Sequence, residues 1–200
     1  MPRALVLATR NAHKVRELGP LLAPWTLEPL PATVELPPET GETFGENAAA
    51  KALAAAAATG RPAVADDSGI EAAALGGAPG VRSARFAGED ASDEDNLAKL
   101  MRDVPTGGDR RVAYVCALAF AEPGGDGPAQ LVEARCEGTL AEDPRGAGGF
   151  GYDPAFLPAD IPDGRTMAEL SPQEKDSISH RGRAARELAA WLRERDGTGS

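Results

Sequence analysis

The chain has 200 residues, of which 42% are hydrophobic, and its formal net charge at pH 7 is −10. Such a chain can bury one substantial core, which excludes disorder, and its negative charge disfavours binding to nucleic acid or to an anionic membrane surface. No apolar run approaches the roughly 20 residues that span a bilayer, and the apolar N-terminus is too short for a signal peptide, so we expect a cytoplasmic protein with a single domain over residues 1–200. A negatively charged protein repels a nucleoside triphosphate. A site that binds one must therefore contain positive charge, from a metal ion and from clustered Lys and Arg side chains.

The hydrophobic pattern predicts alternating strands and helices in the first third of the chain. We expect a strand at 4–8, a helix at 12–22, a strand at 27–30, a loop at 31–42, a helix ending near Thr59 and a strand at 62–66. Thr43 and Glu46 match a capping box for the second of these helices, which is rich in alanine, and Gly60 can terminate it.

The rest of the chain predicts a hairpin and a long C-terminal helix. We expect Gly-rich loops at 76–90 and 146–151, a helix at 93–102, antiparallel strands at 112–121 and 131–136, and a last helix at 179–195. Ser92 and Ser171 stand where helix caps are expected. This order of elements predicts an α/β protein with a mixed, twisted central sheet flanked by helices, without an internal repeat or an interdomain linker.

The two cysteines, Cys116 and Cys136, lie in apolar segments and have no C-x-x-C neighbour. We interpret both as buried, reduced thiols. With only two histidines in the chain, a zinc site is disfavoured as well.

The first candidate site is the turn between the first strand and the first helix, Thr9-Arg10-Asn11-Ala12-His13-Lys14. Open N–H groups at a helix N-terminus and the helix dipole suit a phosphate, and Lys14 adds a positive charge. The spacing of a Walker loop is absent. The alternative interpretation is a capped helix with a solvated lysine.

A second cluster of charged residues surrounds the start of the alanine-rich helix. Glu46 is better explained as the capping acid, whereas Asn47 and Lys51 lie one turn apart and share a face. Glu39, on the preceding loop, is able to reach a cation. A solvated surface cluster is the alternative.

The third segment is Asp66-Asp67-Ser68-Gly69, at the expected carboxyl end of the strand 62–66. Ligands of open α/β sheets bind outside the carboxyl ends of strands. Two adjacent carboxylates leaving a buried strand repel each other and need a cation, hydrogen bonds or a raised pKa. Mg²⁺ takes one or two carboxylates together with waters and phosphate oxygens, so the pair predicts a magnesium site; a simple turn is the alternative.

Two further segments carry groups suited to a base. The loop Phe150-Gly151-Tyr152-Asp153 places two aromatic rings, which we expect to be exposed, where they can stack on a base, with Asp153 as an acceptor for a purine N–H. Basic and hydroxyl groups surround the N-terminus of the last helix, against the helix dipole: Lys175, Ser177, Ser179, His180 and Arg181. These donors suit a base carbonyl or a phosphate, although the loop is also consistent with a plain turn and His180 alone with a structural role.

Other assignments fit less well. Ser68 and His180 lack the G-x-S-x-G context of a serine hydrolase, and no G-x-G-x-x-G follows the first strand.

Taken together and in this order, the five segments resemble the inosine triphosphate pyrophosphatase family, also called the dITP/XTP pyrophosphatases. The resemblance covers nearly the whole chain and rests on the stretches ETGETFGENAAAKA, ADDSGIEAAALGGAPGVRSARFAG, GGFGYDPAF and EKDSISHRGRA. It implies an α/β fold with two lobes around a deep cleft, a homodimer, and hydrolysis of non-standard purine nucleoside triphosphates to the monophosphate and pyrophosphate.

The resemblance also implies roles for single residues. The loop from Thr9 to Lys14 would bind the triphosphate, Asp67 matches the proton acceptor and metal-associated aspartate, and Ser68 matches a substrate contact. The loop from Phe150 to Asp153 matches the base-binding loop, and the residues that match contacts to a 6-keto purine are Lys175, His180 and Arg181. Two departures stand out: Arg10 replaces the Gly of many members, and Pro38 replaces a metal-binding acid of some.

The hypothesis is a Mg²⁺-dependent pyrophosphatase. Asp67 and Glu39 would hold the metal, Asp67 would orient or deprotonate the attacking water, and Lys14 and Lys51 would neutralise the leaving pyrophosphate. Donors arranged for O6 would be left unpaired by adenine, which favours purines with a 6-keto group. The alternatives are a pyrophosphatase for other modified nucleotides and a non-catalytic nucleotide-binding protein.

Overall fold

A computed structural model describes residues 4–124 and 129–197. The described residues form two compact units. Unit 1 takes in the described residues up to Asp67, Cys116–Ala134 and those from Arg181 onward, and unit 2 takes in Ser68–Val115 and Arg135–His180. The single-domain assignment made from the sequence stays a prediction.

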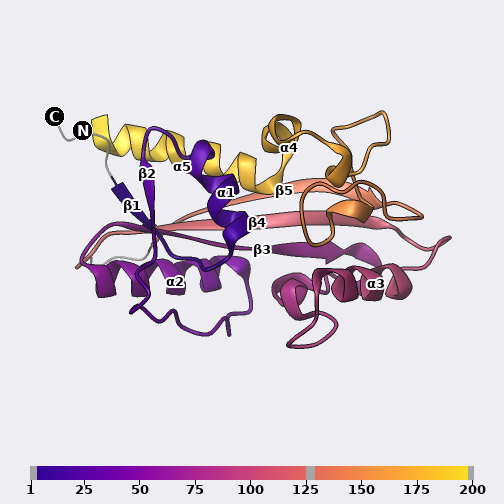
Figure 1. The fold of residues 1–200 in the computed structure, drawn as a ribbon, viewed down its shortest axis with the longest axis horizontal. Helices are drawn as coiled ribbons and strands as arrows, with labels where there is room; N and C mark the ends of the chain where they lie inside the picture. Colours follow the sequence, from indigo (N-terminus) through magenta and orange to yellow (C-terminus); the bar gives the residue numbers. More distant parts are fainter. Residues whose placement is uncertain (1–3, 125–128, 198–200) are drawn as a thin grey trace. The chain divides into compact units, whose positions relative to one another are not determined.

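A six-stranded sheet has the strand order β2-β1-β3-β4-β5-β6 (Figure 1). The strands are β1 (Ala4–Leu7), β2 (Thr26–Pro29), β3 (Ala63–Ala72), β4 (Arg111–Ala121), β5 (Gln130–Leu140) and β6 (Phe156–Pro158). β1 pairs in parallel with β2 and β3, whereas β5 and β6 are antiparallel. The mixed sheet expected from the sequence is therefore confirmed.

The first four α-helices of the described residues begin directly after a capping side chain. The α-helices are α1 (Ala12–Leu21), α2 (Phe44–Thr59), α3 (Asp93–Asp103), α4 (Pro172–Ile178) and α5 (His180–Gly197). Thr43, Ser92 and Ser171 each form a capping box with an acid three residues later, and Gly60 ends α2 with a φ of 64°. The helix starts predicted from these caps are confirmed.

Each unit has its own apolar core. In unit 1, Leu18 of α1 and Leu188 and Leu192 of α5 pack against strand residues such as Leu5 and Leu7. In Figure 1, α5 and α2 lie on opposite faces of these strands, and the alanines of α2 allow a close approach.

The core of unit 2 is built on α3 and the other halves of the long strands. Leu97 and Leu100 of α3 join a buried cluster that contains Ile70, Tyr114 and Phe156. The rings of Tyr114 and Phe156 lie 4.6 Å apart between centroids. Both cysteines are buried thiols outside any disulfide, as expected from the sequence.

Two strand ends predicted from the sequence are wrong. β3 does not end at Asp66-Asp67 but continues to Ala72, because the charge that should have ended it is neutralised by nearby cations. β5 runs on to Leu140 and there pairs with β6, a short strand that the sequence analysis missed. The expected loop at 76–90 contains a 3₁₀ helix, Gly80–Arg85.

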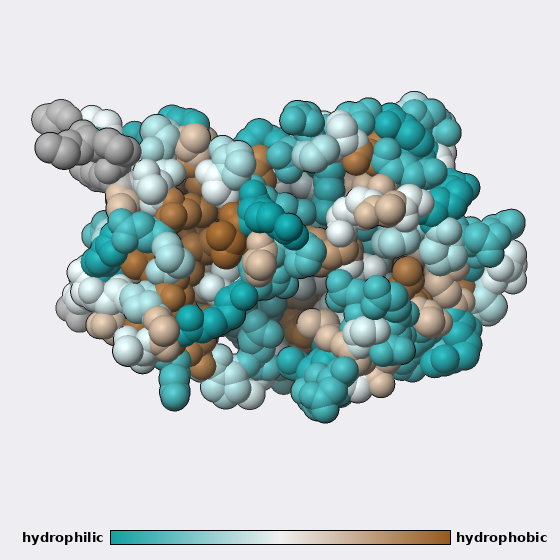
Figure 2. Space-filling view, viewed as in Figure 1, coloured by the Kyte–Doolittle hydropathy of each residue, from teal (hydrophilic) through white to brown (hydrophobic). Residues whose placement is uncertain are grey.

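The surface in Figure 2 is largely hydrophilic, with apolar residues showing mainly near α1 and β2, on the left of the view. Within the described ranges, every helix is too short or too polar to cross a membrane.

Gly69, in the part of β3 that continues past Asp67, packs closely against the 3₁₀ helix at Gly80–Arg85. A Cβ atom at this position would lie 2.3 Å from Ser83 Oγ and 2.7 Å from the carbonyl oxygen of Gly80. We expect Gly69→Ala to lower the free energy of unfolding by about 1–3 kcal/mol through overpacking. Gly45→Ala is the matched control: its Cβ would meet only ordinary contacts, with Leu131 and with Thr43 Oγ1, so this helix position should be neutral or gain up to about 1 kcal/mol. Urea unfolding of both variants measures the difference, and equal effects would contradict the tight packing at Gly69.

Candidate active site

Asp66 is the centre of a charged cluster inside unit 1. It is 0% exposed, and its carboxylate forms ion pairs with Lys14 and with Arg181, whose Nε lies 3.1 Å from Oδ2. The ammonium group of Lys51 donates to the backbone carbonyl of Asp66 over 2.7 Å. Burial would raise the pKa of Asp66, but the charges of Lys14, Arg181 and Lys51 together hold it well below its usual range. Asp66 is therefore an ionised anchor for three cations from three helices.

Arg181 lies at the start of α5 and is itself buried. Besides Asp66, its guanidinium pairs with Glu17 of α1. Burial would lower the pKa of Arg181, but the charges of Asp66 and Glu17 raise it overall. In this structure Arg181 acts as a counter-charge within unit 1, and the contact with a base that the family resemblance implies stays a prediction.

Asp67 follows Asp66 in β3, and its side chain points to the opposite face of the sheet. It is 5% exposed, accepts a hydrogen bond of 2.9 Å from Asn47 Nδ2, and lies 3.9 Å from Lys51 Nζ. Burial raises the pKa of Asp67; Lys51 opposes this rise, and the negative charge of Glu39 adds to it. A buried carboxylate with a raised pKa is suited to accept a proton.

The loop that carries Glu39 is held beside Asp67 by two residues of α2. Lys51 Nζ lies 2.5 Å from a carboxylate oxygen of Glu39, and Asn47 Oδ1 accepts from the backbone N–H of Gly41 over 2.8 Å. The shared face of Asn47 and Lys51 predicted from their spacing is confirmed. No functional role was predicted for Asn47, although its position one turn before Lys51 was the signal available in the sequence.

Asp67 and Glu39 are suitable ligands for Mg²⁺. Across residues 4–124 and 129–197, no three His, Cys, Asp or Glu side chains converge as a metal cluster. Mg²⁺ does not need one, because it binds through one or two carboxylates and completes its shell with water and phosphate oxygens. A buried carboxylate whose pKa is raised partly by a second carboxylate is a place where a divalent cation would be stabilised.

The turn that precedes α1 is organised by Asn11. Its Oδ1 accepts from the backbone N–H groups of His13 and Lys14, and its own N–H donates to Thr9 Oγ1. The expectation that the N–H groups of this turn are open to a phosphate is therefore wrong for Asn11, His13 and Lys14, whose N–H groups are occupied within the turn, and the triphosphate contact expected of the loop stays a prediction. Lys14 turns inward to Asp66, while the exposed Arg10 is directed at backbone carbonyls of residues 30–34.

In unit 2, Asp153 organises the loop predicted to bind a base. It is 2% exposed and accepts from the N–H of Phe150 (2.9 Å), from Lys175 Nζ (2.8 Å) and from the hydroxyl of Tyr114 (3.0 Å). Lys175 Nζ also lies 5.1 Å from the centroid of the Phe150 ring. The Asp153 carboxylate thus already binds three protein donors and fixes both Phe150 and Lys175.

The two aromatic rings of this loop differ in exposure. Phe150 is partly exposed, as expected, but the expectation is wrong for Tyr152, which is 5% exposed and donates its hydroxyl to the carbonyl of Ser83 over 2.7 Å. The loop is tied to α3 by Asp93, which accepts from the N–H of Gly151 over 2.9 Å.

The remaining predicted residues of unit 2 lie close to this loop or to β3. His180 is buried, and its ring stacks on that of Tyr114 with a centroid distance of 4.5 Å and an interplanar angle of 11°. Ser68 is half-buried and directly follows Asp67 in β3. Tyr114 had no role in the sequence analysis, since nothing in an apolar strand marks one tyrosine as functional.

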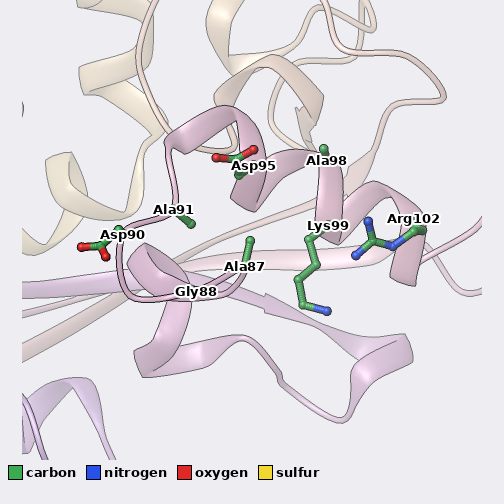
Figure 3. Close-up of a pocket in the computed structure, with 8 residues that line it drawn as sticks. All are labelled: Ala87, Gly88, Asp90, Ala91, Asp95, Ala98, Lys99 and Arg102. Carbon is green, nitrogen blue, oxygen red and sulfur yellow. The ribbon is translucent and has the colours of Figure 1, made fainter.

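A separate pocket of about 490 Å³ lies beside α3 in unit 2 (Figure 3). Its charged lining residues are Asp90, Asp95, Lys99 and Arg102. None of the site residues predicted from the sequence lines this pocket, and Lys99 pairs with Asp103 over 2.6 Å. The candidate functional residues therefore form two clusters, one around Asp66–Asp67 in unit 1 and one around Asp153 in unit 2.

The buried charge of Asp66 has a consequence for stability. We expect Asp66→Asn to cost about 3–5 kcal/mol, because the buried guanidinium of Arg181 would keep Glu17 but lose Asp66 as an anionic partner, and Lys14 would lose the carboxylate with which it pairs. Since the folded pKa of Asp66 is lowered, its stabilising effect is present above the unfolded pKa of about 4 and is lost as the pH falls below it. The variant should therefore lose part of the acid sensitivity that the parent protein shows below pH 4.

Urea unfolding between pH 3 and pH 7 measures both effects. Asp109→Asn is the control, because the pKa of Asp109 is lowered to about 2 by Arg111 but the group is exposed, so its removal should change little. A loss of stability no larger for Asp66→Asn than for Asp109→Asn would refute the anchoring role.

Comparisons with known proteins agree on one family. Residues 5–191 match the Ham1 family. The chain is 50% identical over 195 residues to the dITP/XTP pyrophosphatase of Geobacillus kaustophilus, covering 93% of this chain and 92% of the relative, and 52% identical over 194 residues to that of Deinococcus radiodurans, covering 95% and 92%.

The solved structures give the same result. The structure of a HAM1 protein from Coxiella burnetii is similar with a TM-score of 0.84 and 42% identity, over 96% of this chain and 99% of that one. Sequence identity and fold thus agree over nearly the whole length, and the chain belongs to the Ham1 family.

Proposed function

We propose that this protein hydrolyses non-standard purine nucleoside triphosphates, namely those of inosine, deoxyinosine and xanthosine, to the nucleoside monophosphate and pyrophosphate. The observation that carries the proposal is Asp67: a buried carboxylate with a raised pKa, 3.9 Å from the ammonium of Lys51. The relatives that are 50% and 52% identical in sequence to this chain are named dITP/XTP pyrophosphatases, which supports the same substrates.

The reaction needs a water molecule, a proton acceptor and positive charge. The oxygen of the water molecule attacks the α-phosphorus while Asp67 accepts a proton from that water. The bond between the α-phosphorus and the oxygen that bridges to the β-phosphorus breaks, and pyrophosphate leaves. Lys14 and Lys51, which Asp66 keeps close to β3, offset the charge of the leaving group. No covalent intermediate is needed.

We propose Mg²⁺ as the cofactor, with Asp67 and Glu39 as its protein ligands. When bound, the ion supplies positive charge that neutralises phosphate oxygens. Asn47 and Lys51 keep both carboxylates in place through hydrogen bonds and charge.

We assign recognition of the base to unit 2. The partly exposed ring of Phe150 offers a stacking surface, and Lys175 and His180 offer donors for a 6-keto oxygen. Asp153 and Tyr114 hold these groups in place, so the donors are prearranged. A 6-amino group in place of the keto oxygen would leave such donors unpaired, which disfavours adenine.

The proposal also covers the oligomeric state of the protein and its cellular compartment. We propose a homodimer in the cytoplasm, without nucleic-acid or membrane partners. The buried thiols, outside any disulfide, fit a reducing compartment, and the net charge of −10 disfavours polyanionic partners.

A pyrophosphate-release assay tests the function. With Mg²⁺, we expect turnover of inosine, deoxyinosine and xanthosine triphosphates, with adenosine triphosphate rejected by ~10⁴-fold, and no turnover in EDTA. Asp67→Asn keeps the shape of the side chain and should lower kcat by about 10²- to 10⁴-fold. Near-normal turnover by this variant, or activity in EDTA, would show that the mechanism is wrong, whereas equal turnover of all four triphosphates would contradict selection for a 6-keto purine.

The titration of Asp67 in the protein without Mg²⁺, followed by NMR of its carboxyl carbon, tests the environment of Asp67 in both directions. Since the charge of Glu39 raises the pKa of Asp67, Glu39→Gln should move the titration to lower pH; since Lys51 lowers that pKa, Lys51→Met should move it to higher pH. Glu28→Gln, in an exposed pair with Arg61, is the control and should leave the titration unchanged. Shifts in the same direction for both variants would contradict the effects of Glu39 and Lys51 on the pKa of Asp67.

A further inference from the structure

Arg10 stands where two loops of unit 1 leave the sheet side by side. The register of the parallel strands pairs Leu7, the last residue of β1, with Pro29, the last residue of β2. The turn at 9–14 and the segment at 30–42 therefore start from the same edge. Each leads to a part of the proposed triphosphate site, the first to Lys14 and the second to Glu39.

The guanidinium of Arg10 bridges these loops through four backbone carbonyls. Its Nη1 donates to Leu30 O at 3.4 Å, and its Nη2 lies 3.1 Å from Pro31 O, 3.4 Å from Ala32 O and 2.9 Å from Val34 O. A planar guanidinium with several donors suits such a ring of acceptors, and a hydrogen bond from a charged donor is stronger than one from a neutral donor.

The turn that receives Arg10 is itself fixed. Val34 donates its N–H to Pro31 O over 3.1 Å, and the side chains of Leu30 and Val34 are buried. Arg10 is thus attached to an anchored turn, whereas its own neighbours, Thr9 and Asn11, form the cap of α1. The far end of the same segment is held to α2 through Glu39 and Gly41.

We infer that Arg10 is a positioning residue that ties the turn carrying Lys14 to the segment carrying Glu39, and that it does not itself bind the triphosphate. The inference rests on the proposed function and replaces the substrate contact that the sequence suggested for Arg10. Its physical basis is preorganisation: holding both loops before substrate arrives lowers the cost of ordering them on binding.

A lysine at position 10 distinguishes a tether from a residue that contributes only positive charge. Lysine would keep the positive charge but offers one nitrogen, so it cannot reproduce bonds from two nitrogens to four carbonyls. A group that only attracts phosphate would tolerate lysine, whereas a tether built on guanidinium geometry would not.

The experiment compares Arg10→Ala and Arg10→Lys with Arg102→Ala, an exposed arginine on α3 outside the proposed machinery. We expect both Arg10 variants to raise KM for xanthosine triphosphate about tenfold, with kcat within about twofold of the parent. Hydrogen exchange of the ligand-free protein should show faster exchange at residues 30–42 in both variants. Arg102→Ala should leave KM, kcat and exchange unchanged.

Two results would overturn the inference. One is a KM restored by Arg10→Lys while exchange at 30–42 stays fast, which would make Arg10 a charge contact with phosphate. The other is an unchanged KM, or unchanged exchange, in Arg10→Ala. Hydrogen exchange needs no substrate, so a parent protein without pyrophosphatase activity would disprove the proposed function while leaving the tether itself measurable.

Discussion

The proposed phosphate site depends on the ion pairs of one residue, the buried and ionised Asp66 of β3. Ion pairs and one carbonyl contact connect it to Lys14 of α1, Lys51 of α2 and Arg181 of α5. Removing a charge from water is costly and is offset only when partners are close and well placed, so this cluster admits few substitutions. The same contacts fix the lysines that the reaction needs, which makes one set of bonds serve both stability and chemistry.

Two adjacent aspartates have different properties because a strand directs neighbouring side chains to opposite faces. Asp66 meets cations, and its pKa is lowered; Asp67 meets Asn47 and lies near the charge of Glu39, and burial raises its pKa. Environments that separate the pKa values of two like groups are a common basis for assigning them different roles. Here the ionised residue supports the site and the other is the proposed proton acceptor.

Unit 2 uses a second buried carboxylate for a different purpose. Asp153 binds a backbone N–H, an ammonium and a phenol, and so orders the loop around Phe150 without exposing its own charge. Asp93 and Tyr114 complete this support from α3 and β4. Both units therefore place reactive or recognising groups on rigid elements and hold them with buried polar contacts, as preorganised sites require.

The sequence by itself determined the alternation of strands and helices, the capped helix starts, the mixed sheet and the family, because these depend on local periodicity, on capping residues and on long motifs. It also brought Asn47 and Lys51 to one face, since helical spacing is a local property. Only the tertiary structure decided that β3 continues past Asp66, that Tyr152 is buried and that Arg10 turns to backbone carbonyls. Each of these depends on partners far away in the chain, such as Arg181 for Asp66, and a linear pattern does not record which distant charge or carbonyl folding brings within hydrogen-bonding distance.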